Sequence, residues 1–211
     1  MPKQKNANLV AFHQKEILST ANTLFTQNGI SKTTMDDIAK AAGYSKSTIY
    51  NYFDSKDTIF YHLLHQEMLL MQAQLEEIAS IQQDFPSFFF QVCEHLAFLH
   101  QQKPVFFDAM LQEIQLPDAK HPENHILQKI YAVGEHTNNI FIQKINAAVA
   151  CGIIRQGILP IETTFVLWAS IHGIITTADT KKDYIARRMH KTSNEFMNYG
   201  FHLLLQSLLN K

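Results

Sequence analysis

Residues 33–56 carry a cluster of hydroxyl, amide and amino side chains with the composition of a surface that reads nucleic acid. Five of these side chains lie within one short stretch of the segment, namely Lys46, Ser47, Thr48, Tyr50 and Asn51. Lysine can reach a guanine edge or a phosphate, asparagine can pair with adenine, and threonine can contact a thymine methyl group. Ile49 and Phe53, four residues apart, indicate the inward face of the same helix. The stretch therefore predicts a helix that enters the DNA major groove.

Residues beside this helix supply the local signals that start and stop helices. Thr34 lies three residues before Asp37, a spacing that caps a helix start and places a negative charge in its first turn. Gly43 follows the last apolar residue and provides the left-handed conformation that ends a helix. Ser45 and Ser55 are the expected caps of the next two helices. Two short helices joined by a glycine-containing turn predict a helix-turn-helix.

Residues 33–60 closely resemble the DNA-binding region of TetR-type bacterial transcriptional regulators. The matching positions are Thr33, Thr34, Ile38, Ala39, Ala42, Gly43, Ser45, Tyr50, Tyr52, Phe53 and Lys56, and in the first helix Ile17, Ala21, Leu24, Phe25 and Gly29. The resemblance implies an all-α fold of about nine helices. It further implies a three-helix helix-turn-helix head over residues 1–55 and a helical ligand-binding and dimerisation domain over residues 56–211.

The expected DNA-binding residues combine the reading side of the second helix with flanking phosphate contacts. They are Thr33, Thr34, Tyr44, Lys46, Ser47, Thr48, Tyr50, Asn51, Tyr52 and Lys56. The resemblance assigns the phosphate contacts to Thr33, Thr34, Tyr52 and Lys56. Residues 1–60 contain no arginine, so hydroxyl and amide groups must carry more of the base recognition. For Tyr50 and Tyr52, packing within the head is the alternative to DNA contact.

The distribution of charge places the positive balance in the head. Residues 1–60 contain seven lysines and five acidic residues, a formal charge of +2, whereas residues 61–211 carry −3. The rest of the chain would therefore not itself attract DNA. A formal charge of +2 produces only a weak electrostatic attraction for DNA. The alternative function is therefore a helical ligand- or protein-binding module whose head no longer reads DNA.

The middle of the chain is rich in phenylalanine, which is typical of a core and also of an adaptable ligand pocket. The candidate pocket residues are Phe89, Cys93, Phe98, Phe106, Phe107, Met110, Trp168 and His172. The resemblance favours a pocket for a small-molecule effector that shifts a dimer between two head spacings. Charged groups are scarce in this stretch, so the effector is expected to be apolar or amphipathic.

Two apolar helices, expected over residues 161–178 and 182–209, are the predicted dimer surface. The candidate residues are Phe165, Ala169, Gly173, Phe196, Gly200, Leu203 and Leu204. A two-fold homodimer would present two reading helices about 34–36 Å apart to a palindromic operator in double-stranded DNA. The alternative for these side chains is an internal core.

Other classes of function lack sequence support. Neither nucleophile motifs nor phosphate-binding or dinucleotide-binding loops occur, so neither enzyme activity nor a cofactor is expected. Histidine pairs at His62/His65 and His121/His125 have ligand-like spacing, but no thiolate or carboxylate cluster joins them, and no metal site is expected. Without a signal peptide or a long apolar run, the expected protein is soluble, cytoplasmic and free of membrane contact.

Overall fold

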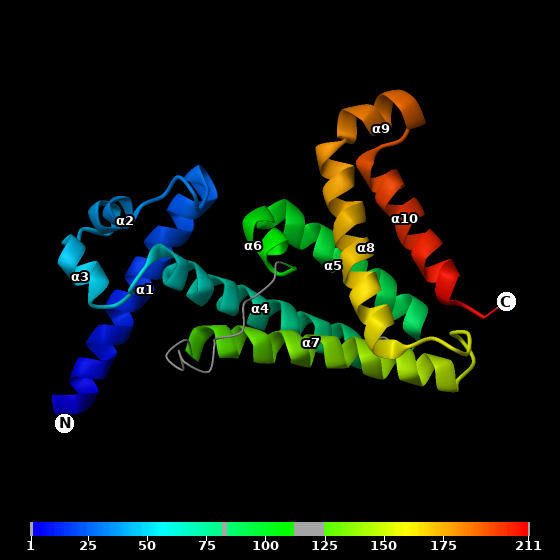
Figure 1. Cartoon of the computed structure of the whole chain (residues 1–211), viewed down its shortest axis with the longest axis horizontal. Coiled ribbons are helices and arrows are strands. Elements are labelled where there is room, and N and C mark those ends of the chain that lie inside the picture. The colour runs from blue at the N-terminus through cyan, green and yellow to red at the C-terminus, as the bar shows by residue number, and fades with distance from the viewer. Residues whose placement is uncertain (1, 82–83, 112–124, 211) are drawn as a thin grey trace. The chain divides into compact units, whose positions relative to one another are not determined.

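A computed structural model of the chain describes residues 2–81, 84–111 and 125–210, with side chains from residue 8 onward. Ten α-helices occupy these residues, and their only β structure is one isolated bridge (Figure 1). The predicted all-α class is confirmed. The chain divides into two compact units, Met1–Met68 with Ile114–Tyr131, and Leu69–Glu113 with Ala132–Lys211.

The first unit contains the predicted head. It comprises α1 (Pro2–Asn28), α2 (Met35–Ala42), α3 (Lys46–Tyr50) and the first turns of α4 (Lys56–Ile81). Helix α1 packs on α2, and α2 packs on α3. The apolar side chains that these helices bury include Ile17, Ala21, Phe25, Ile38, Ile49, Phe53 and Ile59. Burial of this face holds together helices that are too short to be stable alone.

The predicted caps of the head are confirmed. Thr34 and Asp37 form a reciprocal capping box, in which each side chain accepts a hydrogen bond from the other residue's backbone N–H. Gly43 ends α2 in the left-handed conformation, with φ 73°. The hydroxyl of Ser45 accepts a backbone N–H from the first turn of α3, and Ser55 does the same for α4. Local side-chain chemistry therefore defines where each head helix begins.

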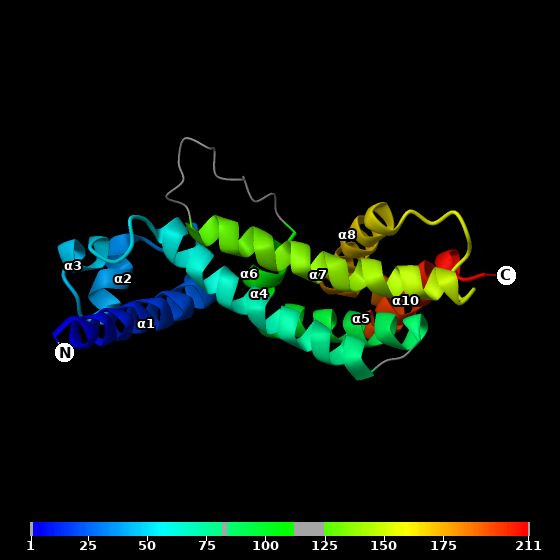
Figure 2. The ribbon, with the colours of Figure 1, turned by 90° about the horizontal axis from the view of Figure 1, so that it is seen from below.

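The second unit is a helical bundle around one apolar core. Besides the end of α4, it contains α5 (Phe85–Gln102), α6 (Pro104–Ala109), most of α7 (His125–Ala150), α8 (Pro160–Thr180), α9 (Lys182–Met189) and α10 (Ser193–Leu208). Within this unit α7 runs beside α4 (Figure 2), and α8 packs along α10 (Figure 1). In the described part of the chain, no helix is both long and apolar enough to cross a bilayer.

One predicted helix is wrong. The C-terminal helix expected over residues 182–209 is two helices, α9 and α10. His190 ends α9 in the left-handed region with φ 52°, and Thr192 starts α10 through a capping box with Glu195. The Thr-x-x-Glu spacing was present in the sequence as a helix start signal. This break accounts for the presence of ten helices in the described residues, where about nine were expected. Of the two histidine pairs noted in the sequence, the pair of His121 and His125 has no structural account, because His121 lies outside the described residues.

Candidate DNA interface and ligand cavity

Helix α3 separates a buried apolar side from an exposed polar side. Ile49 is fully buried and Phe53, just after the helix, is 2% exposed, which confirms the predicted inward face. On the other side Lys46, Ser47, Tyr50 and Asn51 are exposed and Thr48 is half-buried. Asn51 directly follows the last helical residue. Five residues with a polar outer face form a helix that can enter a major groove without exposing the head's core.

Three hydroxyl groups cluster at the N-terminus of α3. The Ser45 oxygen lies 2.9 Å from that of Ser47 and 2.7 Å from that of Thr48, while it also accepts the Thr48 backbone N–H. Hydroxyl groups both donate and accept hydrogen bonds, so this cluster can serve either phosphate oxygens or base edges. Because the Ser45 oxygen also caps the helix, the cap fixes the orientation of this hydroxyl cluster.

Two aspartates at the start of α2 contact two of the predicted DNA-binding residues. Asp36 lies 2.8 Å from the Lys46 ammonium in an exposed ion pair, and its hydrogen bond and charge raise the pKa of Lys46. Asp37 accepts the Thr34 hydroxyl at 2.7 Å, which helps to lower the pKa of that carboxyl. Exposed ion pairs are worth little, so Lys46 can exchange Asp36 for a phosphate at small cost.

Two of the predicted phosphate contacts have hydrogen-bond partners within the head. Thr33 is only 1% exposed, and its hydroxyl donates to the Gly29 carbonyl at 2.9 Å. The Lys56 ammonium donates to the carbonyl oxygens of Ile30, Ser31 and Thr33 at 2.9, 3.4 and 3.1 Å. An ammonium has three N–H donors, so these contacts use all of them. Lys56 therefore ties the loop between α1 and α2 to the start of α4.

A residue that the sequence did not single out joins the interface from α1. The Nδ1 atom of His13 lies 2.6 Å from the hydroxyl of Tyr44, in the turn before α3. The His13 ring also approaches Tyr52, just after α3, with 5.8 Å between ring centroids. All three side chains are half-buried. Because His13 is 31 residues from Tyr44, no local pattern could have revealed the pair.

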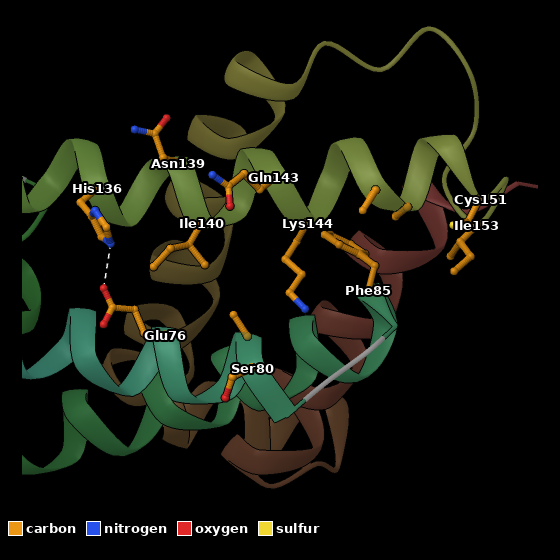
Figure 3. A pocket seen from close by; sticks show the side chains of 13 residues that line it. Glu76, Ser80, Phe85, His136, Asn139, Ile140, Gln143, Lys144, Cys151 and Ile153 are labelled. Carbon is orange, nitrogen blue, oxygen red and sulfur yellow. Dashed lines mark hydrogen bonds and ion pairs between the residues drawn. The ribbon is translucent and has the colours of Figure 1, made fainter.

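A cavity of about 760 Å³ lies in the second unit between α4 and α7, with the start of α5 at one end (Figure 3). It is lined by Glu76, Ala79, Ser80, Phe85, His136, Asn139, Ile140, Gln143, Lys144, Ala147, Ala148, Cys151 and Ile153. Polar side chains and apolar ones contribute to the same wall. Such a lining suits a molecule with both an apolar body and hydrogen-bonding groups.

Ionisable groups from the two helices meet in this cavity. Glu76 of α4 and His136 of α7 face one another with 2.7 Å between carboxylate oxygen and Nε2. Hydrogen bonds from Gln72 and then from His136 lower the pKa of Glu76. Lys144 extends from α7 into the cavity (Figure 3). Its ammonium lies 5.5 Å from the centre of the Phe88 ring. The cavity can therefore bind polar as well as apolar groups.

The cavity is not built from the residues that the sequence suggested. Phe89, Cys93, Phe107 and Trp168 belong to the closed apolar core, Phe106 is buried, and Met110 packs against the core. Burial raises the pKa of the Cys93 thiol, which keeps it neutral. Phe98 is the opposite case, since it is 59% exposed. These side chains could not be assigned from sequence because core and pocket use the same apolar types.

His172 takes part in an aromatic and polar contact instead. Its ring stacks on Phe107 with 4.8 Å between centroids, and its Nε2 lies 3.2 Å from the Asp108 carboxylate. His100 approaches the same Phe107 ring at 4.9 Å. The contacts join α5, α6 and α8 within the second unit, so His172 holds helices together and does not line the cavity of Figure 3.

The predicted dimer residues divide into an outward and an inward group. Phe165 and Leu203 are 58% and 55% exposed, and Ala169 is also exposed. A Cβ atom added at Gly173 would meet nothing within 4 Å. In contrast, Phe196 and Leu204 pack against the core. A Cβ at Gly200 would lie 2.9 Å from Ile174, so Gly200 serves the contact between α10 and α8 within the chain.

The geometry of α2, the Gly43 turn and α3 defines a helix-turn-helix DNA-binding domain. Residues 17–63 match the model of the family described as bacterial regulatory proteins, tetR family. Over 78 residues the chain is 38% identical to the probable acrEF/envCD operon repressor of Escherichia coli K12. That match covers 37% of this chain and only 33% of the relative. By this match, residues 17–63 form a domain similar to that of the tetR family, and the chain spans about a third of the length of this curated relative.

Solved structures extend the likeness in fold to nearly the whole chain. FadR of Bacillus subtilis in complex with stearoyl-CoA has a TM-score of 0.66 at 20% identity, covering 92% of this chain and 98% of that one. A TetR/AcrR-family regulator of Thermobifida fusca has a TM-score of 0.67 at 19% identity, covering 91% and 96%. The arrangement of the C-terminal helices is therefore a known fold.

Proposed function

We propose that this protein is a ligand-responsive, sequence-specific DNA-binding transcriptional regulator that acts as a repressor. The observation that carries the proposal is the capped α2–turn–α3 unit, with Ile49 and Phe53 buried and the polar side of α3 exposed. The family match over the same residues and the repressor named among the relatives support the same function.

A single head offers too small an interface for tight specific binding, so the proposal includes a homodimer on a palindromic operator. The exposed apolar side of α8 and α10, with Phe165, Ala169 and Leu203, supports this assembly. Burial of that surface between two subunits would remove from water side chains that a monomer leaves exposed.

The proposed effector is an amphipathic small molecule bound between α4 and α7. The cavity there combines apolar residues such as Ile140 and Phe85 with Glu76, His136 and Gln143. Stearoyl-CoA, bound by the FadR relative of similar fold, is itself amphipathic. Binding would favour one conformation of the helices and so lower the affinity for the operator.

DNA binding is tested with the full chain on duplexes selected from a randomised pool, followed by titration over a range of salt concentrations. If each subunit neutralises about three phosphates, the logarithm of the affinity should fall with log salt at a slope of about −5. Lys46→Ala should flatten the slope and weaken base preference. Lys191→Ala, an equal charge change on the second unit, is the matched control. Salt-insensitive binding, or no enrichment of any sequence, would support the alternative of a head that no longer reads DNA.

The effector site is tested by filling the cavity. Ala147 lines it and is exposed, so Ala147→Phe should place a ring in the cavity without disturbing the core. Dodecanoate, dodecylammonium and dodecanol share one chain length and differ in head-group charge. At least one should release wild-type protein from the selected duplex, and Ala147→Phe should resist that release. Ala186→Phe, on the exposed side of α9, is the control. Equal release of both variants would place the effector elsewhere.

A further inference from the structure

Among the described residues that line the cavity between α4 and α7, Glu76 is the only acidic one (Figure 3). Its two hydrogen-bond partners contact the same carboxylate oxygen. The Nε2 of Gln72 donates to Oε1 at 2.9 Å, and the Nε2 of His136 lies 2.7 Å from Oε1. Within the described part of the chain, the other oxygen, Oε2, has no hydrogen-bond partner. Glu76 can therefore accept a hydrogen bond from a molecule in the cavity.

The chemistry of a carboxylate restricts which head group can bind there. Hydrogen bonds from Gln72 and then from His136 lower the pKa of Glu76, so the side chain is ionised at neutral pH. An ionised carboxylate only accepts hydrogen bonds, so its ligand must be a donor. A positively charged donor forms the strongest hydrogen bond of this kind. A carboxylate or phosphate head group would instead be repelled by Glu76.

The shape of the cavity suits an extended chain attached to that head group. On α7 the lining begins at His136 and ends at Cys151, a helix length of about 22 Å. Phe85 and Ile153 lie toward the end of the cavity away from Glu76 (Figure 3). A molecule whose charged group binds Glu76 can therefore place its apolar chain against these apolar side chains.

The lining also contains a positive charge, Lys144, further along α7 (Figure 3). Its ammonium lies 5.5 Å from the centre of the Phe88 ring. Hydrogen bonds from Ser87 and, to a smaller extent, the charge of Lys144 lower the pKa of Asp84 at the start of α5. Lys144 thus already interacts with an aromatic face and a carboxylate of this chain. The open oxygen of Glu76 therefore favours a cationic ligand over an anionic one.

We propose that the effector carries a primary ammonium group that binds Oε2 of Glu76, while its apolar chain extends along α7. The proposal rests on the proposed function, since it assigns a chemical class to the effector of the same cavity. A primary ammonium has three N–H donors, whereas a quaternary ammonium has the same charge and no donor. The class of ligand is therefore a protonated alkylamine.

Direct binding is measured by isothermal titration calorimetry on the full chain without DNA, at pH 8.0, where an alkylammonium keeps its proton. Dodecylammonium should bind more tightly than dodecyltrimethylammonium or dodecanoate, each used below the concentration at which it forms micelles. Glu76→Gln should weaken dodecylammonium binding about tenfold, as expected for one hydrogen bond to a charged group. Its affinity for dodecanoate should not fall, because the repelling carboxylate is gone. Glu77→Gln, at the next residue of α4, is exposed and outside the lining, and should bind like wild type.

Several outcomes would overturn the ammonium site. These are tighter binding of dodecanoate than of dodecylammonium by wild type, equal dodecylammonium affinity in Glu76→Gln and wild type, or weaker binding of all three probes by Glu76→Gln. Because no DNA is present, none of them bears on operator binding. If dodecylammonium binds through Glu76 but does not release the selected duplex, the ammonium site stands and the proposed effector role of the cavity fails.

Discussion

At the scale of single residues, the head uses polar side chains for two separate purposes. Lys46, Ser47 and Tyr50 are exposed on α3 and open to DNA. Thr33 and Lys56 have similar chemistry but donate hydrogen bonds to backbone carbonyl groups. Buried or half-buried backbone oxygens need such donors, because an unpaired carbonyl is costly away from water. The residue type alone does not reveal which purpose a side chain serves.

Replacing Lys56 should therefore affect folding. Lys56→Met keeps the apolar stem and removes the donors to Ile30 and Thr33, so the free energy of unfolding should fall by about 1.5 kcal/mol. Urea denaturation followed by circular dichroism measures this change, and Lys15→Met at an exposed position of α1 is the control. Unchanged stability together with a loss of DNA affinity would support the predicted phosphate contact of Lys56 instead.

Histidines of α4 should make the head less stable in acid. Burial, then the neighbouring His65, then Lys129 lower the pKa of His62 in the folded protein. Below the ordinary histidine pKa of about 6.5 the unfolded chain takes up its proton first, so stability falls as pH drops toward the folded pKa.

The pH effect is measured by urea denaturation at pH 7.5 and pH 5.5. His62→Gln removes the titrating group and should lose less stability between these values than wild type. His190→Gln, at an exposed histidine of the second unit, is the comparison and should behave like wild type. An identical loss in His62→Gln and wild type would assign the acid sensitivity to other groups.

At the scale of helices, α8 and α10 approach closely inside one subunit while presenting apolar residues outward. Gly200 provides the room on the inner side, where Ile174 faces it. A Cβ added at Gly173, in contrast, would meet no atom of another part of the described chain within 4 Å. Two glycines that look alike in the sequence therefore have different surroundings.

A matched pair of substitutions separates the two glycines. In Gly200→Ala the new Cβ meets both branches of Ile174, at 2.9 to 3.1 Å, and a β-branched side chain cannot rotate both away. The overpacking outweighs the gain in helix propensity, so stability should fall by about 1 kcal/mol. Gly173→Ala has open space and should not lower the free energy of unfolding. Urea denaturation at one protein concentration compares the free energies of unfolding of the two variants. Equal changes in both would contradict the close packing of Gly200 on Ile174.

At the scale of the whole molecule, the proposed regulator needs two copies. Phe165 and Leu203 from α8 and α10 expose more than half of their surface. Ile161, Val166 and Tyr199 on the same two helices are 58%, 60% and 62% exposed. An apolar area of this kind on two packed helices is typical of a subunit interface.

A charge in this surface should separate the subunits. Phe165→Glu would bury an unpaired carboxylate in the proposed interface, so light scattering should find monomers at concentrations where wild type is dimeric. The affinity of Phe165→Glu for a palindromic duplex should fall as the dimer dissociates, while its affinity for a half-site should not change. Leu70→Glu, at an exposed leucine of α4, is the control. If Phe165→Glu dimerises as strongly as wild type, the subunit contact lies elsewhere.

The sequence alone determined the helices of the head, because capping and apolar spacing act between residues at most four apart. Thr34, Gly43 and Ser45 could therefore be assigned correctly. Tertiary structure alone decided the partners of Lys56, at residues 23 to 26 positions away, and the approach of His13 to Tyr44. It also decided that Phe89, Phe106 and Phe107 are buried while Phe98 is exposed, and that a cavity lies between α4 and α7. Apolar side chains suit a core and a pocket alike, and only packing determines which of them remain accessible.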